Sequence, residues 1–305
     1  MYGNGLNRST AKAINQQIDK LICDLGDPEP PLKLEHVRHL LTLDRIYYSS
    51  DDYSLFTRAF HRMTVAGKQL ISRPSLIKDV ITKRKLRALW EPDARQIFID
   101  AELPDPKKRW AEAHEIGHSL CDWHDTFLHG DQKQTLSIAC HIQIEAEANF
   151  AAGQLLFLRN DFTERWSSTL QDIGAVQSLH KIYQNSLTTT MWKAVECSET
   201  PTFGLICQHP RYVDHSLPLV DHIIHSEVFS KQFTSSSSDS LFTAIKPIAD
   251  FRKRGPVGEG EIHLLDDNGR ARTFVVQLFN NSYQTLVLGR GLKVNSQKPI
   301  YIGNV

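Results

Sequence analysis

The chain has 305 residues, about twice the length of a common single domain, so we expect either two domains or one elaborated domain. Its 41% hydrophobic and 23% charged residues exclude a predominantly disordered or fibrous protein. The 35 basic and 35 acidic side chains cancel, so direct binding to nucleic acid is not expected.

The sequence contains neither a run of about 18 apolar residues that would span a membrane nor an apolar segment of the kind found in signal peptides near its start. Its five cysteines are odd in number and widely spaced, which indicates reduced thiols. We therefore expect a cytoplasmic protein without a membrane partner.

The first hundred residues mix helical and β patterns. Apolar residues at helical spacing predict helices over 11–22 and 34–41. Two β-prone runs predict strands over 45–48 and 96–100. A mixed α and β fold follows.

Two longer helices are predicted next. The first covers 106–122, with Asp105 as its N-cap and a proline in its first turn. The second covers 136–158, and Asn160 and Asp161 are expected to end it. These two helices carry the residues that indicate chemistry.

The last third of the chain is expected to be rich in β-structure. Two short helical patterns come first, with a length and spacing like those of a helix-turn-helix segment. A strand is predicted over 203–207, and a serine tract at 235–238 indicates a loop. Three more strands are predicted, the first two joined by the turn sequence Asp266-Asp-Asn-Gly269; they cover 261–265, 272–279 and 283–288.

The first long helix contains the motif H-E-x-x-H at His114 to His118. The two histidines lie one helical turn apart on the same face, so they can bind one metal ion. Glu115 is rotated by about a quarter turn, where it can reach a metal-bound water without being a ligand. Zinc lowers the pKa of such a water towards about 7, and Glu115 can accept its proton as general base. The motif therefore predicts Zn²⁺-dependent hydrolysis of an amide bond.

A catalytic zinc site needs a third protein ligand and one open position. Glu145 shares a helical face with Ala148 and Ala152, whose small side chains allow a close approach to the first helix. Glu147 on the same helix is an alternative. His124 is another, because it has the spacing of the third histidine in the longer H-E-x-x-H-x-x-G-x-x-H pattern, although the glycine is missing.

Three stretches together resemble the ImmA/IrrE family of metallopeptidases: Ile97-Phe-Ile-Asp100, Lys108 to His118, and Glu145 to Leu156. In that family the zinc is held by the two motif histidines and by a glutamate in the pattern E-x-x-A-N-x-F-A-x-x-L-L. The resemblance thus implies His114, His118 and Glu145 as the metal ligands. Ala151 stands where phenylalanine is usual, so Glu147 remains the alternative.

The resemblance implies an α+β fold with a zincin-like metallopeptidase domain over 1–165 and a helix-turn-helix-like segment over 166–200. A β-rich C-terminal module over 201–305 follows, which is compatible with a GAF-like sensor or a docking domain. The implied substrate is an intracellular protein, namely a transcriptional repressor that binds DNA and is cut in a regulated response.

Two other functions stay open from the residues. One is a non-catalytic regulatory binding protein whose metal site is structural, and the other is a metal-dependent toxin. For a peptidase, His124, His129 and Tyr183 are candidates to stabilise the oxyanion. The strand at 96–100 is expected to align an extended peptide by edge pairing.

Overall fold

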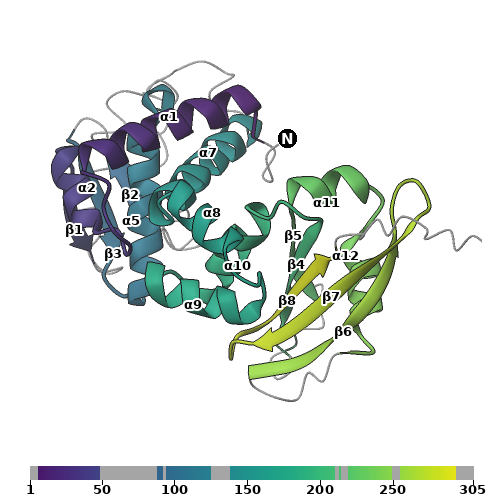
Figure 1. Cartoon of the computed structure of the whole chain (residues 1–305). Coiled ribbons are helices and arrows are strands. Elements are labelled where there is room, and N and C mark those ends of the chain that lie inside the picture. The colour runs from purple at the N-terminus through teal and green to yellow at the C-terminus, as the bar shows by residue number, and fades with distance from the viewer. Residues whose placement is uncertain are drawn as a thin grey trace, which may run out of the picture. The chain divides into compact units, whose positions relative to one another are not determined.

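The structure, a computed structural model, describes residues 6–48, 88–91, 94–124, 138–209, 213, 219–248 and 255–292. The chain forms two compact units (Figure 1). The first contains residues 1–165 and 178–186, and the second contains residues 166–177 and 187–305. Each unit is described by itself.

The first unit is built mainly from helices around a small sheet. Its elements in chain order are α1 (Arg8–Asp24), α2 (Leu34–Leu40), β1 (Asp44–Tyr48), β2 (Ala88–Glu91), β3 (Gln96–Asp100), α5 (Asp105–Leu120), α7 (Ile138–Leu156) and α8 (Asn160–Ser167). Helix α8 extends by its last two residues into the second unit, and helix α9 (Ile173–Tyr183) is also divided between the two units.

The sheet of the first unit has the strand order β1-β3-β2. Strand β1 runs parallel to β3, with Asp44 opposite Gln96, and β2 runs antiparallel to β3 on its other side. The expectation that 96–100 aligns a peptide by edge pairing is therefore wrong, because both edges of β3 are already hydrogen-bonded to neighbouring strands. Its three middle residues, Ile97, Phe98 and Ile99, are buried, as a central strand requires.

Helix α5 packs on this sheet, and α7 packs on α5. Helix α1 contacts both α5 and α7. It does so through a buried stripe at helical spacing that consists of Ala11, Ile14, Ile18 and Leu21. The layers place α5, which carries the H-E-x-x-H motif, between the sheet and α7.

Two predicted helix boundaries in this unit are wrong. The N-cap of α5 is Pro104, and Asp105 is already the first residue of the helix, where its charge favours the helix dipole. Asn160 and Asp161 do not end α7; they are the first two residues of α8. The break after α7 comes instead from Leu158 and Arg159, both of which have positive φ angles.

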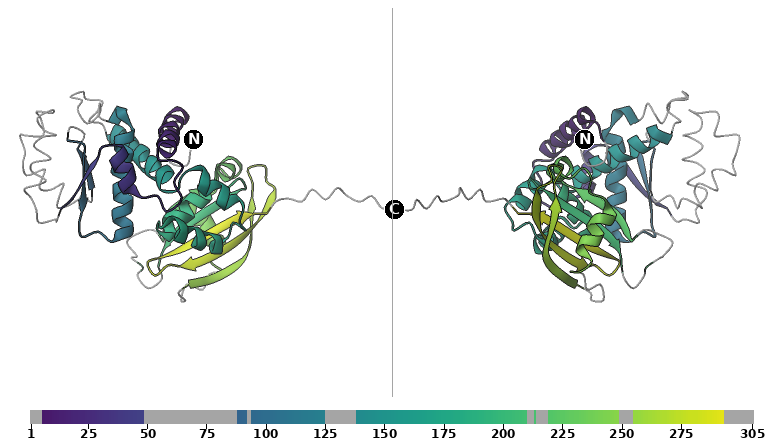
Figure 2. Two further views of the ribbon diagram at one scale, coloured as in Figure 1. Left: turned by 60° about the vertical axis from the view of Figure 1, so that its left-hand side comes forward. Right: turned by 90° about the vertical axis from the view of Figure 1, so that its right-hand side faces the viewer.

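The second unit contains a five-stranded antiparallel sheet with the order β5-β4-β8-β7-β6. Its strands, coloured green to yellow, twist relative to one another in Figure 2. The elements of this unit are α10 (Leu187–Glu196), β4 (Thr202–Gln208), β5 (Val220–His225), α11 (Glu227–Gln232), α12 (Ser238–Ile245), β6 (Gly255–Leu265), β7 (Ala271–Asn280) and β8 (Gln284–Gly291).

Each face of this sheet is covered by helices. On one face, α11 and α12 bury a core of aromatic and aliphatic side chains that includes Phe203, Phe229 and Phe274. On the other face, α10 contacts β4, β5 and β8. A Cβ on Gly204 would lie only 3.2 Å from Val195, so a glycine allows α10 to approach β4 closely.

The predicted hairpin turn at 266–269 joins β6 to β7, and Gly269 has the positive φ angle that this turn requires. Helices α11 and α12 and strand β5 were not predicted. The serine tract is not only a loop, because Ser237 caps α12 through a reciprocal pair of hydrogen bonds with Ser240. With these elements the whole chain has an α+β fold.

Among the described helices, none has the length and apolar character needed to cross a membrane. Four cysteines with described side chains are free thiols, namely Cys23, Cys121, Cys197 and Cys207.

Candidate metal centre

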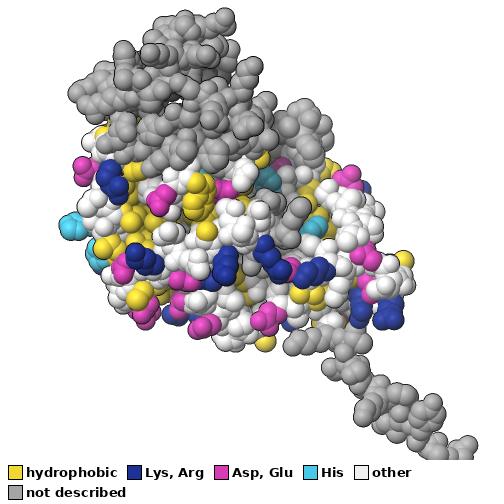
Figure 3. All heavy atoms as spheres, turned by 90° about the horizontal axis from the view of Figure 1, so that it is seen from above, with side chains coloured by type: hydrophobic (Ala, Val, Ile, Leu, Met, Phe, Trp, Pro, Cys, Tyr) yellow, Lys and Arg dark blue, Asp and Glu magenta, His cyan; other side chains and the backbone are white. Residues whose placement is uncertain are grey.

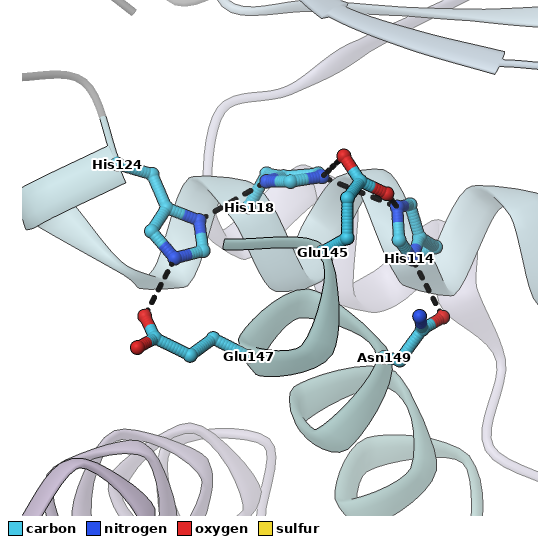
Figure 4. A network of polar contacts seen from close by, with 6 residues as sticks. All are labelled: His114, His118, His124, Glu145, Glu147 and Asn149. Atoms are coloured by element: carbon cyan, nitrogen blue, oxygen red, sulfur yellow. Dashed lines mark hydrogen bonds and ion pairs between the residues drawn. The ribbon is translucent and has the colours of Figure 1, made fainter. Parts of the chain in front are cut away.

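The two motif histidines of α5 face each other through their Nε2 atoms, which are 3.1 Å apart (Figure 4). Their rings stand at 84° to each other with centroids 4.8 Å apart. His118 is buried and His114 nearly so, since only 16% of the His114 side chain is exposed. The i and i+4 spacing therefore produces the shared point that the sequence predicts.

Helix α7 brings the carboxylate of Glu145 to the same point. One of its oxygens lies 3.3 Å from His114 Nε2 and the other lies 3.7 Å from His118 Nε2. Two ligands of a tetrahedral zinc ion, each about 2.0–2.1 Å from the metal, lie about 3.3–3.4 Å apart. The distances among the three side chains thus fit one ion, and all candidate donor atoms lie within 4.8 Å of one another.

The close approach of the two helices depends on Gly117, which lies between the histidines and faces α7. A Cβ placed on Gly117 would be 2.6 Å from the carbonyl oxygen of Ala148 and 3.2 Å from the Cβ of Ala151. The small side chain of Ala151 therefore packs directly against α5. These small side chains let Glu145 reach the histidines.

The second ring nitrogen of His114 contacts Asn149. The distance from His114 Nδ1 to Asn149 Oδ1 is 3.0 Å. An amide oxygen only accepts, so Nδ1 carries the proton and the lone pair of Nε2 is directed at the corner shared with Glu145 and His118, where it can bind a metal ion. This role of Asn149 was not predicted, although its position four residues after Glu145 places both side chains on one face of α7.

The second ring nitrogen of His118 contacts His124 rather than a carboxylate. The two Nδ1 atoms are 3.0 Å apart, and Nε2 of His124 lies 2.9 Å from Glu147. Both alternative ligands proposed from the sequence, His124 and Glu147, thus lie on the far side of His118 from Glu145 (Figure 4). The geometry favours Glu145 as the third ligand.

The charge of the site favours a cation. Burial by itself lowers the pKa of His114, but Glu145, Glu115 and Asn149 together raise that pKa above its usual value. The Nε2 corner of the site is therefore a place where positive charge, from a proton or from a metal ion, is stabilised.

Glu115, the residue after His114 on α5, is buried. Burial raises its pKa from the usual value to about 7, and an additional negative charge on Glu145 acts in the same direction. The backbone amide of Trp90 on β2 hydrogen-bonds to the Glu115 carboxylate and partly offsets this effect. A carboxylate with a pKa near neutrality is suited to accept and release a proton.

Two candidates for oxyanion stabilisation are placed away from the site's open corner. Tyr183 is fully buried between Phe157 and Phe162, and its hydroxyl donates to Asp161. His124 is fully buried and bonded as described above. The third candidate, His129, lies outside the described residues.

Comparison with known proteins gives two findings. Residues 76–189 match the model of a peptidase family described as the IrrE N-terminal-like domain, Peptidase_M78. A solved structure of a Mycobacterium tuberculosis transcriptional regulator is similar in fold, with a TM-score of 0.50 over 99% of this chain and 94% of that chain. Only 12% of its residues are identical, so this likeness concerns the fold alone. No curated protein matches the chain significantly.

Proposed function

We propose that the protein is a zinc-dependent endopeptidase, because residues 76–189 match the model of the IrrE N-terminal-like peptidase family. The observation that carries the proposal is the convergence of His114, His118 and Glu145 on one point beside the buried Glu115. The family match agrees with the resemblance found in the sequence.

Two imidazoles and one carboxylate are a donor set that suits zinc better than magnesium or calcium, which prefer oxygen ligands. When bound, zinc would polarise the scissile carbonyl and lower the pKa of a water molecule. Glu115 then holds the proton that this water loses and passes it to the leaving amine, a role for which a pKa of about 7 is suitable.

The number of ligands supports a catalytic site over a structural one. A structural zinc ion is usually enclosed by four protein ligands, whereas a catalytic one has three and an open position. Among the described residues the cluster has three members, and 43% of the Glu145 side chain is exposed. This supports hydrolysis rather than a non-catalytic regulatory module.

We propose a protein substrate, in particular a transcriptional repressor. An extended segment of it would lie along β2, which is an outer strand among the described residues and contacts Glu115 through Trp90. On the described part of the face shown in Figure 3, Lys and Arg side chains are interspersed with Asp and Glu, which agrees with the balanced charge of the sequence and does not favour DNA as a partner.

The test begins with the metal content of the purified full chain and its cleavage of candidate repressors with and without a chelator. Co-expression with each repressor should yield a specific fragment that Glu115→Gln abolishes while zinc stays bound. A Glu115→Gln protein that still cuts would contradict the assigned base. A chain that purifies without zinc and does not take it up would contradict the metal centre.

The third ligand is tested separately. Glu145→Ala removes a proposed ligand, so the dissociation constant of zinc should rise by a larger factor than in Glu147→Gln, which changes only a group behind His118. The reverse order would identify Glu147 as the ligand.

A further inference from the structure

His124 occupies a fully buried position behind the proposed metal centre. It follows the end of α5 in a tight turn, in which its backbone amide donates to the carbonyl of Cys121 at 2.7 Å. Its ring lies between His118 and Glu147, and the centroids of the His124 and His118 rings are 5.1 Å apart. A buried imidazole with both nitrogens engaged has its proton positions determined by its neighbours.

Glu147 sets the direction of these hydrogen bonds. Its carboxylate accepts from the indole of Trp123 at 2.6 Å and from the amide of Gln143 at 2.9 Å. The indole N–H and the side-chain amide NH2 can only donate, and they approach different oxygens of Glu147, Oε2 and Oε1. Both carboxylate oxygens of Glu147 therefore act as hydrogen-bond acceptors.

The proton order in the two histidines follows from this acceptor. Nε2 of His124, 2.9 Å from Glu147, must donate. A neutral imidazole has one donor and one acceptor, so Nδ1 of His124 accepts, and Nδ1 of His118 donates to it at 3.0 Å. The proton of His118 is then on Nδ1, and the lone pair of its Nε2 is directed at the corner shared with His114 and Glu145.

We propose that His124 is a positioning residue, which together with Glu147 holds His118 in the one tautomer and ring orientation that can bind the metal. A His118 ring protonated at Nε2 would direct a proton, not a lone pair, at the metal. The relay also connects a carboxylate to a ligand through an intervening imidazole, which raises the basicity of that ligand. This inference rests on the proposed metal centre and not on proteolysis.

The first measurement uses the metal-free full chain labelled with ¹⁵N in its histidines. The ¹⁵N shifts of His118, assigned by comparison with His118→Asn, should show a proton on Nδ1 in the wild type. In His124→Phe, which keeps a ring of similar size but no nitrogen, the His118 signals should move to the other tautomer or to a mixture.

The second measurement is the dissociation constant of zinc, from competition with a chelator. Loss of such an outer hydrogen-bonding partner weakens metal binding about 10- to 100-fold, and we expect this range for His124→Phe. Glu147→Gln is a second variant of nearly unchanged size, and its zinc affinity should fall in the same direction.

The matched control is Tyr183→Phe. It removes a part-buried hydrogen bond of the first unit, from Tyr183 to Asp161, that does not involve the histidines. It should lower the melting temperature without changing the zinc affinity or the His118 tautomer.

Unchanged His118 tautomer and zinc affinity within about twofold of wild type in both His124→Phe and Glu147→Gln would overturn the positioning role. If His118 of the metal-free wild type carries its proton on Nδ1 but the protein binds no zinc, the proposed function would be overturned. The role of His124 in setting the His118 tautomer would still hold. The two proposals can thus fail separately.

Discussion

Gly117 and Ala148 come so close that a single added methyl group on Gly117 would lie 2.6 Å from the Ala148 carbonyl oxygen. This contact joins the helix that carries the two histidines to the helix that carries Glu145. The spacing of the proposed metal ligands therefore depends on the absence of a side chain at residue 117.

Gly117→Ala is expected to push α7 away from α5. Alanine favours a helix by about 1 kcal/mol over glycine, but overpacking of the new methyl group against the α7 backbone costs about 1–3 kcal/mol. The free energy of unfolding should therefore fall or stay level. The zinc affinity should fall, because Glu145 moves away from the histidines. Gly153→Ala on α7 is the control, because a Cβ there meets nothing within 4 Å. It should stabilise the protein by about 0.5–1 kcal/mol and leave zinc affinity unchanged.

Glu115→Gln should stabilise the metal-free protein at alkaline pH. Burial raises the pKa of Glu115 to about 7, so folding favours its protonated form, and the stability of the wild type falls as pH rises from about 4.5 to above 7. Glutamine does not titrate. The variant should therefore match the wild type near pH 4.5 and exceed it by about 2–3 kcal/mol at pH 8.5. Urea unfolding at both pH values in a chelator measures this, and a gap independent of pH would contradict it.

Glu112→Ala should destabilise the first unit. Glu112 is buried on α5 and pairs with Arg38 at 2.6 Å and Arg45 at 2.8 Å. Its removal leaves a largely buried guanidinium without its carboxylate, and because Arg45 is partly exposed we expect a loss of about 2–3 kcal/mol. Asp105→Asn on the same helix is the control, since its ion pair with Lys108 is long and exposed, and should change stability by about 0.5 kcal/mol or less. If denaturant unfolding showed the same loss of unfolding free energy in Glu112→Ala and Asp105→Asn, the buried ion pairs of Glu112 would not be the cause.

The hairpin turn between β6 and β7 should make the second unit sensitive to acid. Hydrogen bonds from the Arg270 amide, the Arg272 guanidinium and the Asn268 amide lower the pKa of Asp266. Because the pKa of Asp266 is lower in the folded than in the unfolded state, these hydrogen bonds stabilise the second unit fully above the unfolded-state pKa of about 3.9. This stabilisation is lost as the pH falls through the folded-state pKa.

Asp266→Asn should accordingly be less stable than the wild type at pH 7, and the difference should shrink as pH approaches about 3. Thermal unfolding over this pH range measures it, with Glu259→Gln, an exposed position on β6, as the control for the loss of one negative charge at pH 7. A difference that persists undiminished in acid would show that the charge of Asp266 is not responsible.

The sequence alone was sufficient to predict the features that depend on local spacing. The two histidines share a face because residues four apart on a helix always do, and the hairpin turn at 266–269 follows from residues that tolerate its backbone angles. The family resemblance also came from short patterns within β3, α5 and α7.

Only the tertiary structure decided which groups lie behind the ligands and which strand is central. His124 and Glu147 are separated by more than twenty residues and meet because α5 and α7 pack together, which no periodicity within either helix encodes. The order β1-β3-β2 likewise depends on pairing between segments about fifty residues apart. Such contacts arise from the packing of whole elements, so their partners become known only when the elements are placed in space.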